Sequence, residues 1–307
     1  MKLAAIDCGT NSVRLLIAEV RPDRTLADID RRLHLTRLGQ GVDATGEFAP
    51  DALGRTLDAV ADFAAEIKET GVERTRFVAT AAARDARNRD AFFEGVLERV
   101  GVPAEVIPGE EEAWLSFRGA LATLPAPPEP VLVIDVGGGS TELVVGRGGA
   151  VEAGVSIQVG SVRVRERFLH SDPPTTAEIA AASAHIDALL DGTGVDLASV
   201  RTWIGVGGTV TSLSALHQNL VTYERARVHH STMAPGEVTA LADRLLAMPV
   251  ADVRNFPTMV PKRADVICAG ALVVARIAAR LNVPLLVSET DILDGMILGM
   301  LDQERPL

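Results

Sequence analysis

The sequence predicts an α/β protein with two similar lobes around a central cleft. The main evidence is a strand-turn-strand unit that occurs twice, at residues 5–17 and 133–145. In each copy an apolar run ends in an aspartate, Asp7 or Asp135, and a turn of small and polar residues leads into a second apolar run. Val, Ile and Leu dominate these runs, which is typical of buried strands, so each unit predicts a hairpin.

A proline-rich stretch between the two units predicts the domain boundary. Residues 125–130 contain four prolines, which cannot continue either a helix or a central strand. We therefore place a junction and a hinge there. The N-terminal lobe is expected to span residues 1–124 and the C-terminal lobe residues 125–307. The last helix, at about residues 291–303, is expected to pack back on the first lobe.

The remaining elements follow from apolar spacing and turn residues. Leu53, Leu57, Val60, Ala64 and Ile67 recur at helical intervals. In the first lobe we expect strands near residues 28–38 and 77–80, and helices at 50–70, 88–100 and 110–123. In the second lobe we expect strands at 203–206 and 285–288, and helices at 160–169, 175–190, 235–248, 262–281 and 291–302.

Composition narrows the class of protein. Of 307 residues, 47% are hydrophobic and 23% are charged, as in ordinary globular proteins. We expect no signal peptide before the first strand, and the longest apolar stretch, residues 266–275, is too short to span a bilayer. Cys8 and Cys268 form no disulfide framework or zinc spacing. We expect a cytoplasmic protein with reduced thiols and no membrane partner.

The net charge of −11 argues against nucleic acid as a partner, because binding nucleic acid usually requires a basic surface. The same charge opposes a polyanionic substrate. A phosphate polymer would have to be met by local cations and a metal ion, against the field of the whole protein.

The duplicated turns indicate phosphate binding. A single strand-end aspartate could simply bond nearby N–H groups, but two in matched positions favour a functional interpretation. Backbone N–H groups and small hydroxyls can hold an anion, while carboxylates can hold Mg²⁺, or Mn²⁺ as an alternative. The candidate metal ligands are Asp7, Asp135 and Glu142. The candidate phosphate ligands in the turns are Gly9, Thr10, Asn11, Ser12, Gly137, Gly138, Gly139, Ser140 and Thr141.

Three consecutive glutamates, at residues 110–112, begin a predicted helix. Carboxylates in a first helical turn stabilise the helix dipole by about 0.3–1 kcal/mol each. Alternatively, one of them could be a general base that takes a proton from water. Because consecutive residues point in different directions around a helix, at most one or two can face a cleft.

Other candidate residues each have an ordinary structural alternative. Arg84 could bind phosphate oxygens or form a surface ion pair with Asp85 or Asp90. Arg263 could do the same or remain solvated. The turn at Gly207, Gly208 and Thr209 could approach a phosphate closely or serve only in packing. His229 and His230 are adjacent, which is poor spacing for a single metal ion, so we assign them a surface role.

Taken together, these segments resemble the exopolyphosphatase/guanosine pentaphosphate phosphatase (Ppx/GppA) family. The matching segments are residues 7–12, 80–84, 109–113, 135–142, 205–209 and 261–265. The resemblance implies two actin-like lobes with a ribonuclease H-like core, as in the acetate and sugar kinase, heat-shock ATPase and actin superfamily. It also implies that Glu112 is the base, that Asp135, Gly137 and Glu142 form a metal and phosphate motif, and that Arg84 meets substrate phosphates.

The resemblance implies metal-dependent hydrolysis of the terminal phosphoanhydride of inorganic polyphosphate, by a homodimer. The sequence leaves three alternatives open. The substrate could be guanosine pentaphosphate, the same turns could serve a kinase, or the protein could be a sensor that binds polyphosphate or alarmone without turnover. Two features depart from the family pattern: the chain matches a short form without a helical C-terminal extension, and Leu293 stands where some members have arginine.

Overall fold

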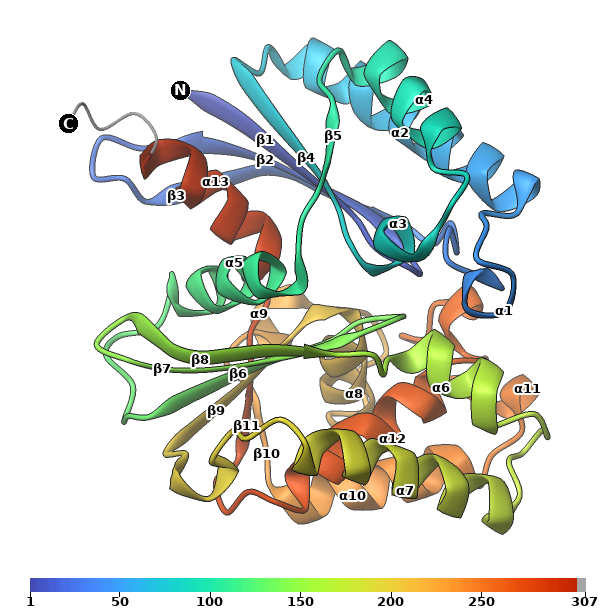
Figure 1. Cartoon of the computed structure of the whole chain (residues 1–307). Helices are drawn as coiled ribbons and strands as arrows, with labels where there is room; N and C mark the ends of the chain where they lie inside the picture. Colours follow the sequence, from blue (N-terminus) through green and yellow to red (C-terminus); the bar gives the residue numbers. More distant parts are fainter. Residues whose placement is uncertain (303–307) are drawn as a thin grey trace.

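The computed structural model describes residues 1–302, which form two mixed β-sheets stacked one above the other (Figure 1). The upper sheet consists of β1 (Lys2–Cys8), β2 (Val13–Val20), β3 (Leu26–His34), β4 (Arg74–Ala79) and β5 (Ala104–Val106). The lower sheet consists of β6 (Val131–Val136), β7 (Thr141–Arg147), β8 (Ala150–Ile157), β9 (Thr202–Val206), β10 (Thr232–Met233) and β11 (Leu285–Val287).

The two sheets share one topology. In the upper sheet the strand order is β3-β2-β1-β4-β5, with β1 antiparallel to β2 and parallel to β4. The lower sheet repeats this order as β8-β7-β6-β9-β11, with the same directions, and adds β10 at its edge. The duplication read from two hairpins therefore extends to five strands in each half. The predicted fold class, an α/β protein with two similar lobes, is confirmed.

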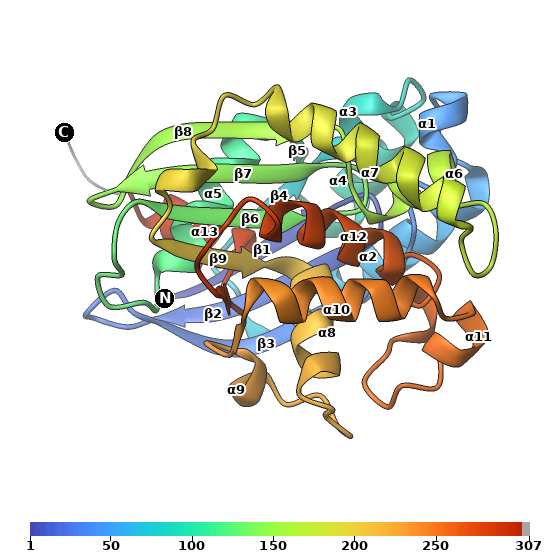
Figure 2. The same cartoon turned by 90° about the horizontal axis from the view of Figure 1, so that it is seen from below.

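Helices cover the outer faces of both sheets and fill the space between them (Figures 1 and 2). The upper half contains α1 (Val42–Thr45), α2 (Pro50–Thr70), α3 (Ala81–Asp85) and α4 (Asp90–Val100). The lower half contains α6 (Ser161–Phe168), α7 (Thr176–Asp191), α8 (Gly207–His217), α9 (Arg225–Val228), α10 (Pro235–Leu246), α11 (Val250–Val253) and α12 (Ile267–Ala278). Between the sheets lie α5 (Gly109–Leu121) and α13 (Ile292–Asp302).

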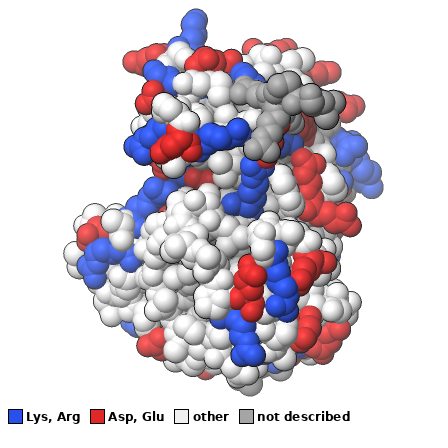
Figure 3. Space-filling model, turned by 90° about the vertical axis from the view of Figure 1, so that its left-hand side faces the viewer, with Lys and Arg blue, Asp and Glu red and all other residues white. Residues whose placement is uncertain are grey.

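Charged groups of both signs are interspersed on the face seen in Figure 3, and much of its lower half carries no charged side chain.

None of the helices within residues 1–302 has the length and apolar character that crossing a bilayer requires.

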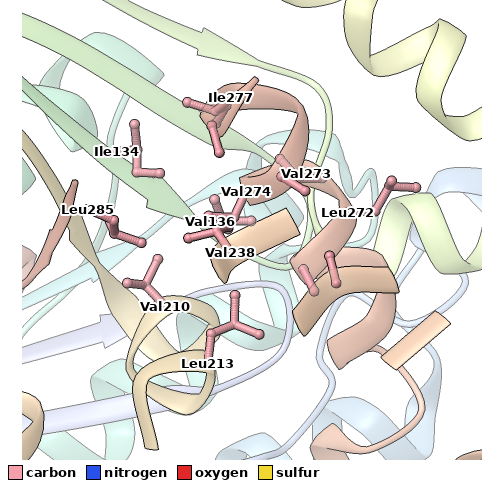
Figure 4. Packing of buried hydrophobic residues seen from close by; sticks show 14 of the residues in the cluster. Ile134, Val136, Val210, Leu213, Val238, Leu272, Val273, Val274, Ile277 and Leu285 are labelled. Carbon is pink, nitrogen blue, oxygen red and sulfur yellow. The ribbon is translucent and has the colours of Figure 1, made fainter. Parts of the chain in front are cut away.

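The largest core lies beneath the lower sheet. Ile134 and Val136 of β6 point toward α8 and toward Val274 of α12 (Figure 4). Every residue of α12 except Arg276 is buried, which explains its nearly continuous apolar sequence. A helix buried on all sides needs no polar stripe, so apolar spacing alone locates its ends poorly.

The expected helix over residues 262–281 is too long. Pro261, Lys262 and Arg263 form a separate 3₁₀ turn, and α12 begins only at Ile267. The third strand was also misplaced, because β3 ends at His34 rather than near residue 38. Three strands, β5, β8 and β10, were not predicted. β5 and β10 are very short, and most of β8 is exposed or half-buried, so none contains a buried apolar run.

Helices α5 and α13 cross at backbone contact. A Cβ added at Gly119 of α5 would lie 1.7 Å from the carbonyl oxygen of Asp291, and one at Gly295 would lie 2.0 Å from that of Leu115. One face of α5 packs on the lower sheet through Ala113, Phe117 and Ala120. The apolar residues of α13 pack on β1 and β2. Because α5 lies between the two sheets, the boundary at residues 124–125 stays a prediction.

This crossing predicts the effect of adding a single methyl group. Gly119→Ala should lower the free energy of unfolding by about 1–3 kcal/mol, because the two helix backbones must separate. Gly54→Ala in α2 is the matched control, since its Cβ would meet no described atom within 4 Å. That change should stabilise the protein by about 0.4–1 kcal/mol. Urea unfolding of both variants measures the difference, and equal effects would contradict the proposed close packing.

Candidate active site

The two hairpin turns have the same geometry. β1 pairs with β2 up to Cys8 and Val13, and β6 pairs with β7 up to Val136 and Thr141, so each turn has four residues. In the first turn Gly9 N–H donates to the Ser12 carbonyl at 2.9 Å. In the second, Gly137 N–H donates to the Ser140 carbonyl at 3.0 Å.

The turns of the two lobes face and touch each other. A Cβ at Gly138 would lie 3.0 Å from Cβ of Thr10, and one at Gly139 would lie 2.7 Å from Oγ1 of Thr10. A side chain at either position would have to displace Thr10, so glycine lets the two turns approach this closely. Together the turns line a single cavity, whose predicted site residues are Asp7, Gly9, Thr10, Asn11, Ser12, Glu112, Asp135, Gly137, Gly138, Gly139, Ser140, Glu142, Gly207, Gly208 and Arg263.

Asp135 and Glu142 make the lower half of the cavity acidic. They are directly opposite each other across the β6–β7 pair. Burial raises the pKa of Asp135 to about 7, and burial together with the charges of Glu112 and Asp135 raises the pKa of Glu142. Glu142 accepts a hydrogen bond from Ser156 at 2.7 Å, and neither carboxylate forms an ion pair within residues 1–302. Two adjacent buried carboxylates without a counterion are well suited to a bound cation.

The upper half has the opposite arrangement at the equivalent position. Asp7 pairs across β1 and β2 with Arg14, where the lower half has Glu142. The Arg14 guanidinium donates to Asp7 Oδ2 at 3.0 and 2.6 Å, and it also donates to Asp291 at the start of α13. Burial raises the pKa of Asp7, whereas Arg14 lowers it. Because Asp7 already has a counterion, it is a weaker cation ligand than Asp135.

The side chains of the three glutamates at the start of α5 lie in different surroundings. Glu110 is exposed, and Glu111 forms an ion pair with Arg76 at 2.7 Å. Glu112 alone lines the cavity, where it accepts a 2.8 Å hydrogen bond from Nη1 of Arg84. Burial, with the charges of Asp7 and Asp135, raises the pKa of Glu112 to about 7, although Arg84 opposes the shift.

Arg84 does not line the cavity itself, but it donates a hydrogen bond to the carboxylate of Glu112, which does. Its Nη1 also donates to the Ile107 carbonyl at 2.9 Å, and its buried Nη2 has no partner among the described residues. It forms no ion pair with Asp85, which binds Arg163 instead.

The amino end of α8 closes one side of the cavity. Gly207 adopts a φ of +80°, and a Cβ there would lie 2.5 Å from Oδ1 of Asp135. Gly208 lies against Arg263, whose half-buried guanidinium donates to Ser212 and forms no ion pair with a described carboxylate. An arginine next to free helix N–H groups can bind an anion.

The hydroxyl groups of two predicted phosphate ligands, Thr141 and Thr209, donate hydrogen bonds to backbone carbonyls instead. Thr141 is fully buried and its hydroxyl donates to the Val159 carbonyl. The Thr209 hydroxyl donates to the Val136 carbonyl at 2.8 Å, although Thr209 lines a small extension of the cavity. His229 and His230 lie outside the cavity, with their rings stacked 3.7 Å apart.

The residues present fit a hard cation held largely through water. Within residues 1–302, no three His, Cys, Asp or Glu side chains are placed to bind one metal ion directly. Magnesium commonly uses only one or two carboxylates and completes its shell with water and phosphate oxygens. Asp135 and Glu142 satisfy that requirement.

Sequence analysis missed Arg14, which lines the cavity and neutralises Asp7. A signal was present, because Arg14 follows Asp7 at the same interval as Glu142 follows Asp135. Asp291, its second partner, comes from the far end of the chain and left no local signal.

Two sheets of the same topology, whose matched turns meet in a cavity lined by carboxylates, define a two-lobed α/β class of protein. Within that class, this chain belongs to the Ppx/GppA phosphatase family, which matches residues 16–304.

Individual relatives match over almost the full chain. This chain is 45% identical to exopolyphosphatase 2 of Mycobacterium tuberculosis, over 97% of this chain and 98% of that protein. The crystal structure of an exopolyphosphatase-like protein superposes with a TM-score of 0.94 at 40% identity, covering 99% of both chains. That of the Aquifex aeolicus Ppx/GppA family member gives 0.85 at 32% identity, covering 100% of this chain and 99% of the other.

Proposed function

We propose that this protein is an exopolyphosphatase, which hydrolyses the terminal phosphoanhydride of inorganic polyphosphate and releases orthophosphate. The observation that carries the proposal is the position of Glu112, a buried carboxylate in the cavity that both glycine-rich turns line. The relative from M. tuberculosis, named as an exopolyphosphatase, supports the same activity.

The side chains around the cavity suit an in-line attack by water. Glu112 would orient a water molecule and accept its proton as the terminal phosphorus is attacked. Turn N–H groups, the amino end of α8 and Arg263 would stabilise charge on the phosphate oxygens. Arg84 would hold the Glu112 carboxylate in the orientation that the attack requires.

Asp135 and Glu142 would hold Mg²⁺, with Mn²⁺ as the alternative, and Asp7 would be a more distant contributor because Arg14 neutralises it. When bound, the cation supplies positive charge that offsets the negative charge of the phosphate oxygens. It would also favour the ionised forms of these carboxylates, whose pKa values burial raises.

The raised pKa of Glu112 predicts how activity depends on pH. The base works only when ionised, so turnover should rise with pH and level off above the pKa of Glu112, which is about 7 before a cation binds. A bound cation would move this limb to lower pH. Turnover measured across pH at saturating Mg²⁺ tests this prediction, and a rate that falls as pH rises through the same range would contradict it.

The proposed activity itself is tested by phosphate release from long-chain polyphosphate with Mg²⁺, and after removal of the metal by a chelator. We expect release only with the metal present, and its recovery when Mg²⁺ or Mn²⁺ is added back. Phosphate release that is unaffected by chelation would overturn the assigned role of Asp135 and Glu142.

A second cavity favours guanosine pentaphosphate as an alternative substrate. Its volume is about 280 Å³, and it shares Arg14, Gly207, Gly208 and Arg263 with the phosphate cavity. Leu33, Tyr223 and Val260 border it and are among the few large apolar side chains that are exposed. An apolar pocket with a few polar groups, next to a phosphate site, could hold a nucleoside.

Relative rates of phosphate release from polyphosphate and guanosine pentaphosphate decide between the two substrates. Tyr223→Ala should impair guanosine pentaphosphate hydrolysis more than polyphosphate hydrolysis if the second cavity holds the base. Equal effects on both substrates would exclude that role for the cavity.

A further inference from the structure

A third pocket lies where the two lobes meet, beside the ends of α1 and α11. The upper lobe contributes Arg37 and Arg55, and the lower lobe contributes Arg254, Lys262 and Asp265. Contacts across the junction fix this arrangement: Arg37 donates to Asp265 and to the Lys262 carbonyl, and Lys262 donates to the Leu35 carbonyl at 3.3 Å.

This pocket has more cations than the carboxylates around it can neutralise. Only Arg37 has a carboxylate partner, Asp265. Arg55 donates to the Thr36 carbonyl at 3.1 Å, and neither it, Arg254 nor Lys262 forms an ion pair with any residue in 1–302. By contrast, the arginines around the second cavity, apart from Arg263, are each bound by carboxylates, at 2.6 Å in the case of Arg14 and Asp7.

The basic pocket also adjoins the phosphate cavity on both lobes. Arg37 N–H donates to the Asn11 carbonyl at 3.0 Å, so the pocket directly follows the first phosphate turn. On the lower lobe, Lys262 precedes Arg263, which lines the phosphate cavity. A chain held at its end by the turns could therefore leave the cavity past Arg263 and reach the pocket.

We propose that this pocket, formed by Arg37, Arg55, Arg254 and Lys262, binds the distal phosphates of a polyphosphate chain whose terminal phosphate lies between the turns. The inference rests on the proposed function. It accounts for the use of a polyanion by a protein of net charge −11, because unpaired cations gather next to the site. At the opposite end of the molecule, Figure 3 shows charges of both signs interspersed instead.

The test is binding of long-chain polyphosphate and of tripolyphosphate at fixed salt, in a Glu112→Gln background that removes the proposed base. Adding Arg55→Ala, Arg254→Ala and Lys262→Ala should weaken binding of the long chain by about tenfold, as expected for three exposed ion pairs. Tripolyphosphate is too short to extend far from the cavity, so its affinity should fall much less.

A matched control removes three positive charges at the far ends of the strands. Arg21, Arg147 and Arg201 are exposed and lie where β2 and β7 end and β9 begins, away from the turns. Their replacement by alanine should change affinity for the long chain less than twofold if the effect is local.

Equal losses in the two triple variants would overturn the proposal, as would equal losses for the two ligands or no loss. A single-stranded RNA of matched charge that displaces the long polymer equally well would overturn the assignment to polyphosphate. Absence of phosphate release by the unmodified enzyme would instead refute the proposed hydrolase activity, while the binding difference would still decide this inference.

Discussion

Replacement of Glu112 by glutamine is expected to lower the turnover of polyphosphate by about two to four powers of ten. Glutamine keeps an oxygen that can accept the hydrogen bond from Arg84, so the local geometry should survive. What it loses is the ability to take a proton from water. Phosphate release by the purified variant, at saturating Mg²⁺ and polymer, measures the effect.

The neighbouring Glu110 supplies a matched control, because it lies on the same helical turn but is exposed to solvent. Glu110→Gln should retain nearly full turnover. If Glu112→Gln also retains full turnover, Glu112 is not the base. If neither the unmodified protein nor any variant releases phosphate while polyphosphate still binds, the sensor alternative is correct.

The parts of the site that could be predicted from sequence are those encoded in short segments. Each hairpin has its own apolar runs and turn residues, and the pairing then places Asp7 and Asp135 at equivalent strand ends. The contact between the two turns is different in kind. It depends on how the two lobes pack. The trace of it in the sequence is the pair Gly138 and Gly139, where a side chain would meet Thr10 of the other turn.

The glutamate cluster shows what local reasoning leaves open. Carboxylates at the start of a helix satisfy its dipole whichever of them faces a cleft. Glu112 is the one that faces the cavity because of the direction of α5. That direction is set by the packing of α5 on the lower sheet and against α13. The family resemblance implied Glu112 as the base, a role that stays a proposal, whereas apolar spacing could not have singled out any of the three glutamates.

Buried ion pairs were the least predictable feature. Arg14 has partners seven and 277 positions away, and the second contact exists only because α13 returns to the upper sheet. Similarly, the 3₁₀ turn at Pro261–Arg263 is separate from α12, which begins at Ile267, although the sequence predicted one continuous helix there. Arg263, which lines the cavity, belongs to this turn.

Replacement of Arg14 by methionine is expected to lower the free energy of unfolding by about 3–5 kcal/mol, because it leaves two buried carboxylates without a counterion. Arg14 donates to both Asp7 and Asp291, and all three side chains are at most 15% exposed. Methionine fills much of the same volume, so the loss reports mainly on charge. Urea unfolding at neutral pH measures it.

The pH dependence separates this electrostatic cause from a packing defect. Burial already raises the pKa of Asp7 in the folded protein although Arg14 opposes it, and Arg14 helps to hold the pKa of Asp291 below its ordinary value. Without Arg14, burial would raise the pKa of Asp7 further and would shift that of Asp291 upward. The folded state would then take up protons more readily, so the deficit should shrink as pH falls from about 8 to about 5. Arg147→Met breaks only an exposed pair with Glu152 and should cost less than about 1 kcal/mol at any of these pH values. A deficit in the Arg14 variant that stays constant across this range would show that lost packing, rather than unpaired charge, destabilises it.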